Sequence, residues 1–131
     1  PTDTGIFVRI GEDGKSHQLT LDRRPLGEMG AIFLPWSQAR VLRNPDGIRF
    51  YKPGEWNDVA VRVEGEPARL RMWLNGALIT DFQHTPESTK GVPILGRIGL
   101  QVHPDVPNLT TWKPGNSVRY RNIRVHRLDA R

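Results

Sequence analysis

The sequence contains no cysteine, which excludes disulfide bonds and thiolate metal sites. It also lacks calcium-loop spacing of acidic residues and the G-x-S-x-G motif of serine hydrolases. No apolar run approaches the roughly 20 residues of a membrane-spanning helix. The four histidines are scattered without short-range ligand spacing, at His17, His84, His103 and His126. We therefore expect no metal site, no catalytic serine and no membrane partner, and the sequence leaves any cofactor unknown.

The sequence also has no concentrated block of positive charge. Its formal net charge is +5 over 131 residues, a balance that invites a nucleic-acid-binding interpretation. However, the arginines are spread along the whole chain, and no nucleic-acid-binding motif accompanies them. We expect a solvated, arginine-rich surface and no nucleic-acid partner.

What the sequence does contain is 13 glycines and 11 prolines, which separate short runs of alternating apolar and polar residues. Alternation with a period of two indicates half-buried strands, and many short runs of this kind are typical of an all-β sandwich or barrel. The length suits one domain, residues 1–131. No helix beyond a single turn is expected, and residues 36–50 read as an irregular loop. Strands are predicted within residues 5–10, 17–21, 30–34, 59–64, 69–74, 77–82, 96–103 and 117–128.

Two turns are predicted from their residue types. The segment "GEDGK" at residues 11–15 should close a hairpin. Asn75-Gly76 lies between two alternating runs and should form a type I′ hairpin turn.

The segment "GRIGLQVHP" at residues 96–104 predicts a strand with two chemically different faces. Ile98, Leu100 and Val102 should face a core, so that Gln101 and His103 point to the opposite face. Other predicted strands also carry polar residues on the face opposite their apolar row. If these strands are neighbours in the sheet, their polar residues form one patch, which consists of Arg9, Gln18, Thr20, Gln101 and His103.

Such a patch has two interpretations. Outward polar residues of an antiparallel sheet are commonly just solvent-exposed. Alternatively, this mixture of donors and acceptors suits sugar hydroxyl groups. The indole rings of Trp36 and Trp112, in the two longest loops, could then stack against sugar rings.

Several motifs, in order along nearly the whole chain, resemble those of a known family. They are "DTGIFVRI", "HQLTLD", "GAIF", "KPGEWNDVAVRVEG", "LNGALITDF", "GRIGLQVH" and "VRYRNIRVHRL". The family is that of 3-keto-disaccharide hydrolase domains. The resemblance implies an antiparallel β-sandwich of the concanavalin A-like jelly-roll type, and a bacterial periplasmic or secreted location. It also implies that residues 1–131 are the C-terminal two-thirds of a larger domain, whose absent strands, or another chain, would pair with the strand at residues 5–10.

The resemblance further implies glycoside substrates that carry a ketone at C3. Cleavage can then proceed by removal of the C2 proton, elimination at C1 and addition of water. We assign His103 as the base and Arg9 with Gln101 as donors to the enolate oxygen, and we expect the substrate to contact Gln18, Thr20, Trp36 and Trp112. Gln18 and Thr20 depart from the family, which has Glu and Gln there. A non-catalytic carbohydrate-binding module and a structural interaction domain are therefore the alternatives.

Overall fold

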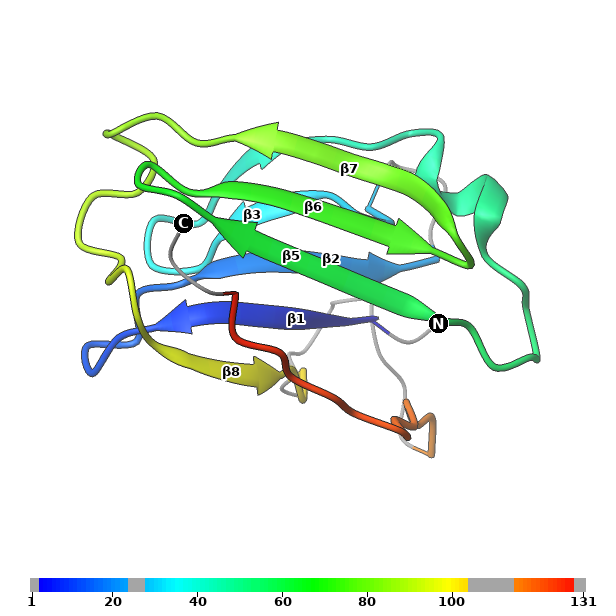
Figure 1. The fold of residues 1–131 in the computed structure, drawn as a ribbon. Coiled ribbons are helices and arrows are strands. Elements are labelled where there is room, and N and C mark those ends of the chain that lie inside the picture. Colours follow the sequence, from blue (N-terminus) through cyan, green and yellow to red (C-terminus); the bar gives the residue numbers. More distant parts are fainter. Residues whose placement is uncertain (1–2, 24–27, 104–114, 129–131) are drawn as a thin grey trace.

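The structure is a computed structural model that describes residues 3–23, 28–103 and 115–128. These residues form eight strands and one short 3-10 helix, arranged as two antiparallel sheets (Figure 1). The five-stranded sheet has the order β4-β3-β2-β1-β8, and the three-stranded sheet has the order β5-β6-β7. The elements are β1 (Asp3–Ile10), β2 (His17–Asp22), β3 (Ile32–Leu34), β4 (Ala39–Leu42), η1 (Gly47–Phe50), β5 (Val59–Glu64), β6 (Arg69–Leu74), β7 (Ala77–Gln83) and β8 (Arg97–Leu100).

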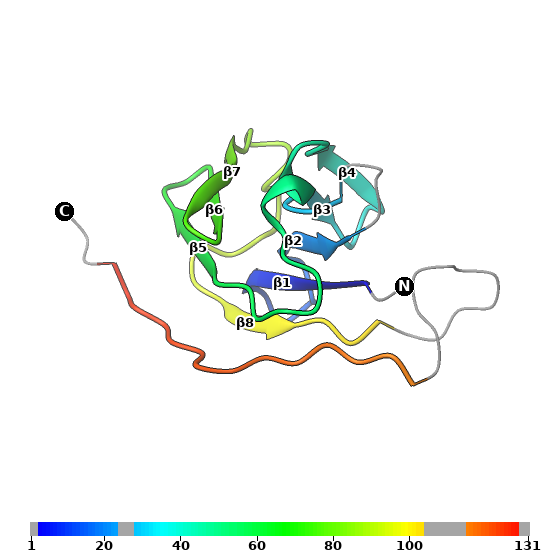
Figure 2. The same cartoon turned by 90° about the vertical axis from the view of Figure 1, so that its right-hand side faces the viewer.

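The two sheets pack face to face over a single apolar cluster (Figures 1 and 2). Alternation along β2 places Leu19 in this cluster, beside Val8 of β1 and Ile32 of β3, while β6 contributes Leu70 and Met72. Burial of this surface drives the sheets together. The prediction of an all-β sandwich is confirmed, and the jelly-roll connectivity stays a prediction.

Both predicted hairpin turns are present. The Gly11 N–H donates to the Lys15 carbonyl across 2.9 Å, which closes the β1–β2 hairpin. Asn75 and Gly76 have φ values of 51° and 84°, and positive φ at both central positions is the geometry of a type I′ turn. These turns fix the registers of β1 with β2 and of β6 with β7.

Two predicted element assignments were wrong. The segment 36–50, predicted as an irregular loop, contains β4 and η1. Residues 117–128, predicted as a strand, have no ladder partner among the described residues and run outside the sandwich beneath β8 (Figure 2). Alternation supplies two chemically different faces, but a strand also needs a neighbouring backbone to pair with.

The strand at residues 5–10 also has no unpaired edge, contrary to the expectation from the sequence. β1 is a central strand, with β2 on one side and β8 on the other. The edges of the sheet are β4 and β8, and β8 lies beyond β5, the edge of the narrower three-stranded sheet (Figure 1). For that reason the row predicted to face the core is solvent-exposed, with 53 % of Ile98 and 93 % of Val102 accessible.

We expect the Leu19 contact to dominate the stability of the sandwich. Leu19→Ala removes a fully buried side chain and should lower the free energy of unfolding by about 2–5 kcal/mol. The matched control is Leu78→Ala, because Leu78 is 49 % exposed and its truncation should cost well under 1 kcal/mol. Urea denaturation of both variants measures the difference, and equal losses would contradict this description of the core.

Candidate functional site

The outer face of the five-stranded sheet carries a row of buried polar side chains from β2. Gln18, Thr20 and Asp22 alternate with the core residue Leu19 and so project away from the three-stranded sheet. All three are buried, with Gln18 only 5 % accessible. Polar groups with so little solvent contact need partners within the protein, which separates this row from an ordinary solvated sheet face.

Gln18 is joined to Gln101, the residue that follows β8, by a hydrogen bond that crosses β1. Its Nε2 donates to Oε1 of Gln101 at 3.1 Å. The path lies over Gly5 of β1, where an added Cβ would stand 2.8 Å from Gln18 Nε2. The missing side chain at residue 5 therefore lets the Gln18 amide on β2 meet the amide of Gln101, just after β8.

His103 lies at the end of the same face, next to an aspartate that the sequence analysis did not select. Its Nε2 is 3.8 Å from Oδ2 of Asp3, and both side chains are largely buried. Asp3 pairs in register with Asp22 across β1 and β2. The alternation that selected Gln18 and Thr20 also predicts this face for Asp22, but Asp3 stands at the start of its strand and had no preceding pattern to mark it.

A cavity of about 340 Å³ lies beside this aspartate–histidine pair. Asp3, Gln101 and His103 line one side, and residues 116–118 with Tyr120 line the other. Thr4 joins the two sides, because its hydroxyl donates to the Gln101 carbonyl at 2.8 Å and is hydrogen-bonded to the Tyr120 hydroxyl at 2.8 Å. Burial raises the pKa of Tyr120, so its phenol stays protonated and can donate or accept a hydrogen bond.

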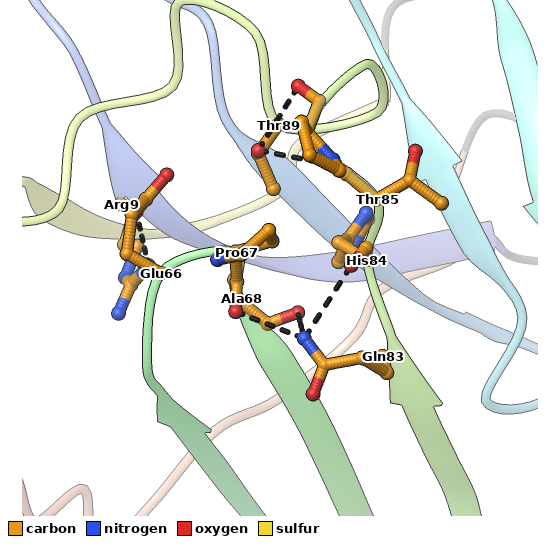
Figure 3. Close-up of polar contacts among 9 residues, drawn as sticks. Arg9, Glu66, Pro67, Ala68, Gln83, His84, Thr85 and Thr89 are labelled. Atoms are coloured by element: carbon orange, nitrogen blue, oxygen red, sulfur yellow. Dashed lines mark hydrogen bonds and ion pairs between the residues drawn. The ribbon is translucent and has the colours of Figure 1, made fainter.

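Arg9 does not join this patch, and the expectation that it shares the face of His103 was wrong. An extra residue between Phe7 and Ile10 shifts the register against β8, and Arg9 adopts a φ of 56°. The shift turns the guanidinium toward the three-stranded sheet, where Nη1 lies 3.5 Å from Oε2 of Glu66 (Figure 3). Burial lowers the pKa of Arg9, and the charge of Glu66 opposes that effect.

Trp36, one of the two tryptophans expected at the site, does not line the cavity. Trp36 lies at the other end of β2, where its ring centroid is 6.5 Å from that of His17. Trp112 lies outside the described residues. The structure therefore brings together Gln18, Thr20, Gln101 and His103, and adds Asp3 and Asp22 to them.

The described ranges contain no cluster of three or more histidine, aspartate or glutamate side chains arranged to hold a metal ion. Among the same residues, no helix has the length and apolarity needed to cross a membrane. The described site combines amide, carboxylate, imidazole and hydroxyl groups with the apolar side chains of Leu100, Val102 and Val118, which also line the cavity.

The fold and the site define a β-sandwich domain with a small cavity at one end of its larger sheet, lined by both polar and apolar side chains. A protein-family model described as a 3-keto-alpha-glucoside-1,2-lyase-like domain matches residues 1–126. The chain belongs to this family, which confirms the resemblance found in its motifs. A search of the curated proteins and a search of the solved structures each find no match.

Gly5→Ala tests the contact between Gln18 and Gln101. The new methyl group should displace the Gln18 amide and lower the free energy of unfolding by about 1–3 kcal/mol, the usual cost of overpacking. In a Gln18→Ala background the same substitution should cost about 1 kcal/mol less, because the obstructing amide is gone. Urea denaturation of the two single variants and the double variant measures this coupling, and strictly additive losses would contradict it.

Proposed function

We propose that this domain cleaves glycosides whose glucosyl unit carries a ketone at C3. The family to which the chain belongs is described as a 3-keto-alpha-glucoside-1,2-lyase-like domain. The observation that carries the proposal for this chain is the Asp3–His103 pair at the cavity, with Gln101 beside it. These groups suit proton abstraction next to a ketone, which needs a base and a donor for the oxygen that becomes negative.

The C3 ketone makes the C2 hydrogen acidic, because the electron pair left at C2 is delocalised onto the ketone oxygen as an enolate. A neutral imidazole at His103 takes this proton. The electron pair then forms the C1–C2 double bond while the bond from C1 to the glycosidic oxygen breaks, and that oxygen takes up a proton as it leaves. Addition of water across the double bond completes a net hydrolysis.

Gln101 is the proposed donor to the enolate oxygen. The side-chain oxygen Oε1 of Gln101 accepts the hydrogen bond from Gln18, which leaves the side-chain NH2 group free to donate. In this interpretation Gln18 positions Gln101 rather than removing protons, which gives a role to an amide where the family has a carboxylate. Arg9 has no part in this step, because its guanidinium lies toward Glu66 on the other side of the sheet.

His103→Ala should lower kcat on a 3-keto-disaccharide by roughly 10²-fold or more, the usual range for a general base. The melting temperature should change little, because the residue lies outside the apolar core. His126→Ala is the matched control and should keep both values, since His126 is exposed on the C-terminal segment. Wild-type turnover in His103→Ala would exclude His103 as the base. Binding of an unoxidised disaccharide without any turnover by the wild type would instead favour a carbohydrate-binding module.

Asp3→Asn tests the carboxylate next to the imidazole. A carboxylate that orients the imidazole affects the rate of proton transfer and not the binding of substrate. The substitution should therefore lower kcat by roughly 10-fold while KM stays within about twofold of wild type. Steady-state kinetics on the same substrate separates the two constants. A raised KM with unchanged kcat would assign Asp3 to substrate binding instead.

A further inference from the structure

Two histidines that take no part in the proposed reaction meet between the sheets at the other end of the sandwich. His17 begins β2 in the five-stranded sheet, and His84 directly follows β7 in the three-stranded sheet. Their rings stack with centroids 4.1 Å apart at an interplanar angle of 33°. His17 is 0 % and His84 is 2 % accessible, so this histidine stack is an internal contact that joins the two sheets.

The surroundings of the histidine stack suit neutral rings. The edge of the Phe82 ring meets His84 with centroids 4.9 Å apart, and Trp36 lies against His17. Nδ1 of His84 is hydrogen-bonded to the Ser88 hydroxyl at 2.8 Å. Within the described part of the chain, both ring nitrogens of His17 and Nε2 of His84 are buried without a hydrogen-bond partner. A protonated imidazole needs two acceptors, and this environment does not supply them.

The charge that faces the stack has the wrong sign to stabilise an imidazolium. Arg9 approaches from β1, and its guanidinium is paired with Glu66 on the β5–β6 connection (Figure 3). The other ring and hydrogen-bond contacts of the two histidines within the described ranges are with neutral groups: the Trp36 and Phe82 rings and the Ser88 hydroxyl. A proton on either histidine would therefore add a buried positive charge beside a second basic ring and an arginine.

We propose that the histidine stack is an acid-sensitive contact that holds this end of the sandwich closed while both rings are neutral and opens it when either ring takes up a proton. At this end the two sheets meet at the histidine stack and at the ion pair between Arg9 Nη1 and Glu66 Oε2, which are 3.5 Å apart (Figure 3). The hydrogen bond from Gln83 Nε2 to the Pro67 carbonyl, at 2.9 Å, stays within the three-stranded sheet. The stack is the contact that joins the start of β2 to the residue after β7.

The direction of the pH dependence follows from the burial. Burial, with smaller contributions from His84 and Arg9, lowers the pKa of His17 to about 3. Burial and Arg9 lower the pKa of His84 to about 4. In an unfolded chain both imidazoles would have the ordinary pKa of about 6.5. The two neutral rings therefore contribute fully to stability above about pH 6.5. This contribution is lost as the pH falls from about 6.5 toward 4 for His84 and toward 3 for His17. Each histidine then lowers the folding equilibrium constant by up to about tenfold per pH unit.

Urea unfolding between pH 7.5 and 4.5 tests the proposal on the wild type, on His17→Phe, on His84→Phe and on the double variant. Phenylalanine keeps an aromatic ring but cannot take up a proton. Each single substitution should reduce the slope of the logarithm of the folding constant against pH by about one between pH 6 and 5, and the double variant by about two. His126→Phe, on the exposed C-terminal segment, is the matched control and should leave the slope close to wild type.

A double variant with the wild-type slope would overturn the proposal. If the variants do not fold, the imidazole NMR signals of the wild-type protein decide the same question. Both rings should stay neutral at pH 5 for as long as the protein is native, and a titration of either ring near pH 6.5 in the folded protein would overturn the proposal. Neither measurement depends on turnover, so the result is independent of the proposed function.

Discussion

The alternation of side chains along β2 is the constraint on which both the core and the candidate site depend. Leu19 enters the apolar cluster and packs with β6, while its neighbours Gln18 and Thr20 are forced onto the opposite face of the sheet. A shift of one residue in the pairing of β1 with β2 would exchange the two sets. The hairpin turn at residues 11–15 fixes that pairing, so the same local geometry that builds the core also places the polar row.

The cavity depends on a second constraint, which is the course of the chain after β8. Thr4 links the Gln101 carbonyl to Tyr120, and Arg121 lies over the Trp56 ring with its guanidinium carbon 3.9 Å from the centroid. These contacts hold the C-terminal segment along the outside of the sandwich, where it forms one side of the cavity. The site thus combines Gln101 and His103, which directly follow β8, with a segment held by a few side-chain contacts.

Much of this arrangement could be predicted from residue patterns, and the failures have specific physical causes. The polar row on β2 and the pair Gln101 and His103 followed from strict alternation, and the "NG" turn followed from its need for positive φ. The face predicted for Arg9 was wrong because one extra residue in β1 reverses the alternation, and nothing in "FVRI" indicates that extra residue. The predicted burial of Ile98 and Val102 was wrong because alternation assigns only the face of a side chain, whereas burial depends on how far the opposite sheet extends.

The central claim is that this domain removes the C2 proton of a 3-keto-glycoside, and deuterium incorporation tests it most directly. A 3-keto-disaccharide is cleaved in D2O, and the released 3-ketoglucose is examined by NMR, with product incubated without protein as the blank. We expect deuterium at C2 above the blank, because the proton removed by the base is replaced from solvent when water adds across C1 and C2. Cleavage that leaves the original hydrogen at C2 would contradict it.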